Sequence, residues 1–109
     1  MRWSYNEDKY CCDEFVRKYI IEKDYTSSSI FAYNLSLKLK GLDEGSIKMK
    51  ISNIVYITNF LKINHTCDIA PLCNYSDQNI IALGESLREN NIPFDRELVR
   101  KIIQQKKSH

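Results

Sequence analysis

Apolar residues recur every three or four positions along most of the chain, a period that places them on one face of an α-helix. The first run predicts a helix from just after Ser4 to about Glu22. Ser4, followed three residues later by Glu7, has the form of a capping box, in which each side chain accepts a hydrogen bond from a backbone N–H. The inward stripe of this helix is Cys12, Phe15, Val16, Tyr19 and Ile20.

A second helix of about three turns is predicted after the serines at 27–29, one of which can cap it. Gly41 supplies the left-handed backbone that commonly ends a helix. The inner face of this helix consists of Ala32, Leu35 and Leu39.

A third helix is predicted from Glu44 to about Leu61, with Asp43 as its cap. Its β-branched residues make a strand over residues 51–57 the competing interpretation, but the 3.6-residue stripe favours a helix. The buried stripe is Ile47, Ile51, Ile54, Val55, Thr58 and Leu61. The sides and outer face then carry Ser46, Lys48, Lys50, Ser52, Asn53 and Tyr56.

The rest of the chain predicts a connection and two more helices. Residues 63–75 have no sustained period and read as a connecting segment that packs Ile69 and Leu72 onto the helices. Ser76 caps a fourth helix to about Glu89, and Asp95 caps a fifth. The inward residues of these two helices are Ile80, Leu83, Leu87, Leu98, Val99, Ile102 and Ile103.

These elements predict an all-α fold in one domain of 109 residues. Residues 3–62 form a three-helix core of helix-turn-helix layout, and residues 76–105 add two C-terminal helices. No apolar run reaches the roughly 18 residues of a membrane span, and the N-terminus lacks the pattern of a secretory signal. We therefore expect a cytoplasmic protein with free thiols and no membrane partner.

Charge is unevenly spread along the chain. The net charge is only +2, but residues 36–62 carry five basic and two acidic side chains, whereas residues 6–24 carry four basic and six acidic ones. The C-terminal residues 96–107 add five basic side chains against one acidic. The abundance of Ile, Lys, Asn and Tyr is typical of AT-rich coding, which suggests a low-GC bacterium or its phage.

The second and third predicted helices are joined by the short turn at residues 40–43, as in a helix-turn-helix whose third helix enters the DNA major groove. Ammonium groups neutralise phosphate, and an Asn amide can pair with adenine. The candidate reading residues are Lys48, Lys50, Ser52 and Asn53, and the candidate phosphate contacts are Lys38, Lys40 and Lys62. A solvated face of a helical bundle is the alternative interpretation.

Three segments resemble the Myb/SANT-like helix-turn-helix domain. They are Trp3-Ser4-x-x-Glu7-Asp8, the pair Leu35 and Leu39, and the stretch from Gly45 to Ile54. The last of these, with Pro71-Leu72-x-Asn74-Tyr75-Ser76-x-Gln78-Asn79, is most similar to a bacterial and phage version found in small uncharacterised proteins and beside HNH endonuclease domains. Together they cover roughly residues 3 to 80.

The resemblance implies DNA binding through the third helix, with Trp3 in the core. Domains of this type commonly carry three regularly spaced tryptophans, and this chain has one. The remaining core volume must then be filled by Phe15, Tyr19, Tyr33 or Tyr56. SANT-like domains often bind protein rather than DNA, so the resemblance is compatible with either kind of partner.

Catalytic and metal chemistry are poorly represented in the sequence. An HNH site needs a pair of histidines with Asn and a metal, and the only histidines are His65 and His109. His65, Cys67 and Cys73 match no closed zinc pattern, so we expect both cysteines to be small apolar fillers. One of Cys11 and Cys12 is expected in the core and the other near the surface. We predict no enzyme, no cofactor and no metal site.

Two functional hypotheses remain. The first is a phage or mobile-element protein that binds duplex DNA with its third helix, as a monomer or a homodimer. The second is a protein-interaction module that binds and inhibits or regulates a host protein, such as a CRISPR or restriction nuclease, in an anti-defence role. The second rests on the near-neutral total charge, the acidic first helix and the many tyrosines.

Overall fold

The computed structural model describes residues 3–107, in which helical segments are joined by turns, a linker and one longer connecting segment. The helical segments are α1 (Tyr5–Phe15), the π-helical η1 (Val16–Ile21), α2 (Ser28–Ser36), α3 (Glu44–Phe60), α4 (Asp77–Glu89) and α5 (Arg96–Lys107). No strand occurs within residues 3–107, so the all-α prediction is confirmed, including helix rather than strand over 51–57. None of the helices in this range is both long and apolar enough to cross a bilayer.

The helices begin at the predicted caps. Ser4 and Glu7 form both halves of the capping box, with the Glu7 N–H donating to Ser4 Oγ at 3.1 Å. Asp43 accepts the Ser46 N–H at 2.7 Å, and Ser27 and Ser76 accept in the same way at the starts of α2 and α4. Each cap satisfies a backbone N–H that has no partner within its helix.

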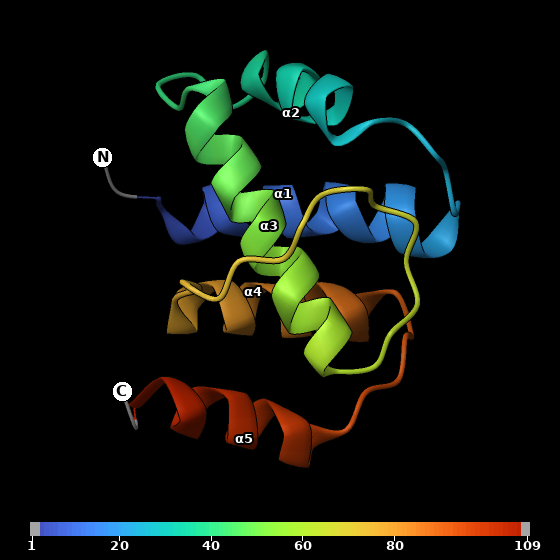
Figure 1. Cartoon of the computed structure of the whole chain (residues 1–109), viewed down its shortest axis with the longest axis vertical. Coiled ribbons are helices and arrows are strands. Elements are labelled where there is room, and N and C mark those ends of the chain that lie inside the picture. The colour runs from blue at the N-terminus through green and yellow to red at the C-terminus, as the bar shows by residue number, and fades with distance from the viewer. Residues whose placement is uncertain (1–2, 108–109) are drawn as a thin grey trace.

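The helices α1, α2, α4 and α5 lie roughly side by side, and α3 runs across them (Figure 1). α1 packs along α4, α2 packs against α3, and α3 also contacts α1, α4 and α5. α5 is held in part by Tyr75, whose hydroxyl donates to the Ile102 carbonyl at 3.0 Å. The result is a helical core with two further C-terminal helices, as predicted.

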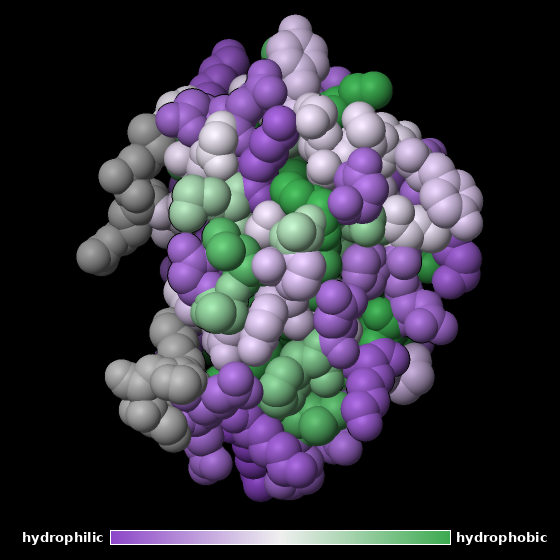
Figure 2. All heavy atoms as spheres, viewed as in Figure 1, coloured by the Kyte–Doolittle hydropathy of each residue, from purple (hydrophilic) through white to green (hydrophobic). Residues whose placement is uncertain are grey.

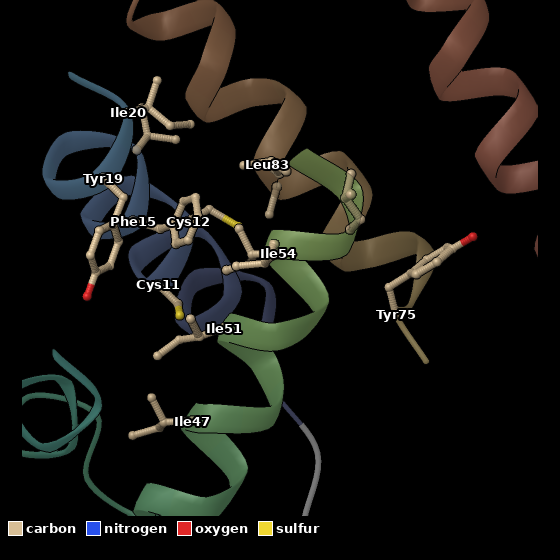
Figure 3. Packing of buried hydrophobic residues seen from close by; sticks show 14 of the residues in the cluster. Cys11, Cys12, Phe15, Tyr19, Ile20, Ile47, Ile51, Ile54, Tyr75 and Leu83 are labelled. Carbon is tan, nitrogen blue, oxygen red and sulfur yellow. The ribbon is translucent and has the colours of Figure 1, made fainter. Parts of the chain in front are cut away.

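The core forms where α3 crosses α1 and α4. The predicted stripes of α1 and α3 are all buried, and Figure 3 shows Cys11, Cys12 and Phe15 facing Ile51 and Ile54. The prediction that one of the two adjacent cysteines lies near the surface is wrong, since both are fully buried. α1 packs along α4 and is crossed by α3, so two of its faces are covered rather than one.

Within the first predicted helix, residues Val16–Ile21 form a π-helix instead of an α-helix. Its wider turn is seen in the bond from the Glu22 N–H to the Arg17 carbonyl at 2.9 Å, five residues back. The Tyr19 carbonyl accepts the Thr66 N–H at 3.1 Å, and the Tyr19 hydroxyl donates to the Thr26 carbonyl at 2.8 Å. The π-helix thereby fastens both the linker at 22–27 and the connecting segment.

α2 is shorter than predicted and ends at Ser36 rather than near Gly41. After Ser36 the hydrogen bonding becomes 3₁₀-like, because the N–H groups of Leu37 and Lys38 bond to carbonyls three residues back. Gly41 has the expected left-handed backbone, with φ of +93°. Leu39 is buried in this turn, so the predicted inner face is confirmed although its last member lies outside the helix.

Truncation to alanine should affect the free energy of unfolding very differently at two positions of α3. Ile51→Ala removes a fully buried side chain and should lower the free energy of unfolding by about 2–5 kcal/mol. Met49→Ala, at a half-exposed position of the same helix, is the matched control and should change it by less than about 0.5 kcal/mol. Urea denaturation measures both. Equal effects would contradict the placement of the core.

Candidate interaction surface

Lys50, a predicted reading residue, is held inside the protein. Its ammonium group lies 3.0 Å from the Asp8 carboxylate and 4.9 Å from the centre of the Trp3 ring, and its side chain is only 13% exposed. A cation over an aromatic face and beside a carboxylate has two partners already. The prediction that Lys50 lies on the open face of the third helix is therefore wrong.

Ser52 and Asn53 are also buried, and Asn53 is only 5% exposed. The Asn53 amide donates to the Asn74 side chain at 2.8 Å, and the Ser52 carbonyl accepts the Leu72 N–H at 3.1 Å. The connecting segment that supplies these partners crosses α3 (Figure 1). The predicted outer face of α3 is thus covered by the chain itself.

The remaining candidate lysines do not form one surface. Lys38 and Lys40 are exposed in the turn before α3, and Lys62 is exposed just after α3 ends. The 17-residue α3 separates these two groups by about 25 Å along its axis. Lys48 is partly exposed between them. The four lysines are spread along the helix rather than gathered at a groove.

Trp3 lies at the edge of the core and is half-buried, so the implication that it sits within the core is wrong. Phe15 and Tyr19 fill the interior instead, both fully buried, with ring centres 5.3 Å apart. Tyr56 is partly buried and stacks on Tyr75, whereas Tyr33 is exposed.

Asp8 is the centre of a buried polar cluster that the sequence analysis did not find. Besides Lys50, its carboxylate accepts the Gln78 amide at 2.6 Å and the Asn79 amide at 3.0 Å. Gln78 and Asn79 belong to the first turn of α4, where the helix dipole also favours a negative charge. In sequence, Asp8 looks like an ordinary acidic residue in the first turn of a helix, so nothing marked it as a link between helices.

His65 and the cysteines are engaged in packing. His65 Nδ1 accepts the Cys67 N–H at 3.1 Å and Nε2 lies 2.8 Å from Asn59 Oδ1, so the neutral ring with a proton on Nε2 satisfies both contacts. Burial raises the pKa of both Cys11 and Cys12, which keeps them as thiols. Cys67 packs against the core as expected, but Cys73 is exposed and fills no space. No group of three His, Cys, Asp or Glu residues suited to a metal ion occurs in the described part of the chain.

α2 has apolar residues on two opposite faces. Phe31, Ala32 and Leu35 face the core and are buried. Ile30 and Tyr33 lie within one narrow stripe on the other side, and Leu37, the C-cap with helical backbone angles, continues it, because positions i, i+3 and i+7 share a helix face. They are 56%, 52% and 57% exposed, and we call them the α2 outer face. Hydrophobic residues are visible at the edge of the molecule over α2 (Figure 2).

The α2 outer face is itself uncharged and has charged residues beyond both ends. Residues 25–37 contain no charged side chain, and the nearest charges in the sequence are Asp24 before them and Lys38 and Lys40 after them. A shallow hollow between α2 and α1, lined by Tyr10, Asn34 and Lys38 among others, borders the face. The sequence carried a signal for this surface, since residues 30, 33 and 37 repeat at helical spacing opposite the residues identified as the inner face.

Asp8 makes a strong prediction for stability. Asp8→Asn leaves the Lys50 ammonium without a carboxylate and should lower the free energy of unfolding by about 3–5 kcal/mol in a urea titration. Asp13→Asn removes an exposed partner of Lys9 and should cost less than about 1 kcal/mol. The double variant Asp8→Asn/Lys50→Met should recover part of the loss, because no unpaired charge remains. A cost below about 1 kcal/mol for Asp8→Asn would contradict a stabilising role for the cluster.

His65 makes a prediction for pH dependence. Burial lowers its pKa, so the unfolded chain, with an ordinary His pKa of about 6.5, takes up the proton first as the pH falls. The free energy of unfolding should therefore decrease as the pH falls below about 6.5, until the folded protein also protonates. Urea midpoints between about pH 8 and 5.5 measure this. His65→Gln should flatten the profile, and an unchanged profile in that variant would exclude His65 as the cause.

We find no match between this chain and any protein-family model, curated protein or solved structure. The function is therefore inferred from the geometry and chemistry of the described residues.

Proposed function

We propose that this chain is a protein-interaction module that binds another protein through the α2 outer face. The observation that carries the proposal is a stripe of three large apolar side chains, each more than half exposed, two on α2 and the third at its C-cap. Clustered apolar residues at a surface mark sites of association, whereas single ones are ordinary. Tyr33 adds a hydroxyl to the stripe, and tyrosine is enriched in protein interfaces.

The chemistry of the α2 outer face favours protein over nucleic acid as the partner. Duplex DNA is held mainly through cations that neutralise phosphates, and residues 25–37 supply no cation. The partner surface that fits is an apolar helix face or ridge, with carboxylates placed to meet Lys38 and Lys40 at one end. Binding of this kind regulates a partner by occupying its surface.

DNA binding through α3 has less support from the geometry. Lys50 is paired with Asp8, Asn53 is paired with Asn74, and Ser52 is buried. Of the predicted contacts, Lys38, Lys40, Lys48 and Lys62 remain for phosphate, and they are distributed from the turn before α3 to the residue after its C-cap. Binding of duplex DNA by the purified chain would therefore contradict the proposal.

Site-specific photo-crosslinking in cells that naturally express the chain tests the proposal. A photoreactive benzoylphenylalanine in place of Tyr33 should crosslink to a protein chain, whereas the same group in place of Ile81 should not. Ile81 is 52% exposed on α4, so it matches Tyr33 in exposure but lies on another helix. Leu37→Asp in the Tyr33-labelled chain should reduce the crosslinked yield about tenfold or more, since it places a charge in the contact.

Two results would overturn the proposal. One is equal crosslinking from positions 33 and 81. The other is binding of duplex DNA by the purified chain at about 0.15 M salt, lost when Lys38, Lys40 and Lys48 are changed to alanine. The second result would favour DNA binding over protein binding.

A further inference from the structure

The α2 outer face has a pattern that is nearly the same in both directions along the helix. Ile30 and Leu37 form its ends, and Tyr33 lies between them. When two copies of such a helix pack antiparallel about a twofold axis near Tyr33, Ile30 of one copy faces Leu37 of the other. The two tyrosines then meet at the centre. A twofold dimer requires a self-complementary patch of this kind.

α2 is followed by two lysines. Lys38 and Lys40 are exposed just beyond its C-terminal end, and within residues 3–107 no carboxylate lies close enough to form an ion pair with either. The helix dipole favours cations at this end, so the lysines are stable there without a partner. This end of the face is positive.

Within the described part of the chain, a carboxylate without an ion pair lies at the N-terminal end of α2. Asp68 is exposed, and its carboxylate accepts the Ser28 N–H at 3.0 Å in the first turn of α2. The other carboxylates nearby are already paired, Asp24 with Lys18 at 3.5 Å and Glu22 with Arg17 at 3.0 Å. Hydrogen bonds from Ser28 lower the pKa of Asp68, so it is charged at neutral pH and available to a cation of another chain.

The apolar pattern and the charges agree on one arrangement. In an antiparallel pair, Lys38 and Lys40 of each copy approach Asp68 of the other, at both ends of the contact. In a parallel pair, the lysines of the two copies would meet. Among the described residues no other helix lies on the outer side of α2, so a second copy can approach it (Figure 1).

We propose that the partner of the α2 outer face is a second copy of this chain, bound through α2 in an antiparallel twofold dimer. This inference rests on the proposed function, because it uses the same surface. Three half-exposed side chains from each copy make a small contact, typical of a transient rather than a permanent association. The dimer should therefore depend on protein concentration.

Sedimentation equilibrium of the full chain between about 10 µM and about 1 mM tests the dimer. The wild-type chain should shift from monomer towards dimer over this range. Tyr33→Asp should raise the dissociation constant at least about tenfold, because it brings two carboxylates together at the twofold axis. Ile81→Asp, the same kind of change at an equally exposed position on α4, should leave it unchanged.

A mixing experiment tests the antiparallel charge pairing. Lys38→Glu/Lys40→Glu should weaken the dimer, and so should Asp68→Lys, because each variant places like charges at both ends of its own contact. Mixed in equal amounts, the two variants should form a heterodimer about as tight as the wild-type dimer, since opposite charges then meet at both ends. Circular dichroism confirms that each variant is folded.

The outcomes separate this inference from the proposed function. If the chain stays monomeric at about 1 mM while position 33 still crosslinks to a different protein, the homodimer is overturned. The proposal that the α2 outer face binds a protein would then still stand. A dimer that survives Tyr33→Asp, or a mixture that fails to recover dimerisation, overturns the antiparallel arrangement. A monomer with no crosslink from position 33 overturns both proposals.

Discussion

The arrangement of the helices depends on the buried carboxylate of Asp8. A carboxylate with no exposure to water is stable only when its charge and lone pairs are matched, and here Lys50 of α3 and two amides of α4 supply the partners. One side chain of α1 therefore holds three helices in register. Apolar packing alone tolerates sliding of one helix along another, whereas a matched buried charge does not.

This cluster determines what α3 can do. Lys50 supplies the charge that Asp8 needs, so it is not available to a ligand. The same side of α3 is closed further by the connecting segment, through the bonds from Asn53 to Asn74 and from Leu72 to Ser52. α3 resembles a recognition helix in sequence, yet in the structure it is the central helix of the core, in contact with α1, α2, α4 and α5.

α2 stands in contrast to α3. It lies at the edge of the molecule and keeps its second apolar face in solvent, where each exposed Ile, Tyr or Leu is more costly than a polar residue would be. Its first turn is bonded to Asp68 of the connecting segment, and that segment is in turn bonded to the π-helix through Thr66. A firmly held helix with an uncharged, apolar outer face suits association with another protein better than contact with a polyanion.

Local chemistry was enough to predict the helices themselves. The caps at Ser4, Asp43 and Ser76 and the buried stripes of α1 and α3 follow from hydrogen bonding and periodicity within a few residues. The candidate site did not follow, because periodicity shows that a helix has an inner face but not what covers the opposite one. Only the tertiary structure decided that Asn53 lies beneath the connecting segment, that Lys50 meets Asp8 across 42 positions of the chain, and that Tyr33 stays uncovered. These outcomes depend on contacts between distant segments, which no local pattern encodes.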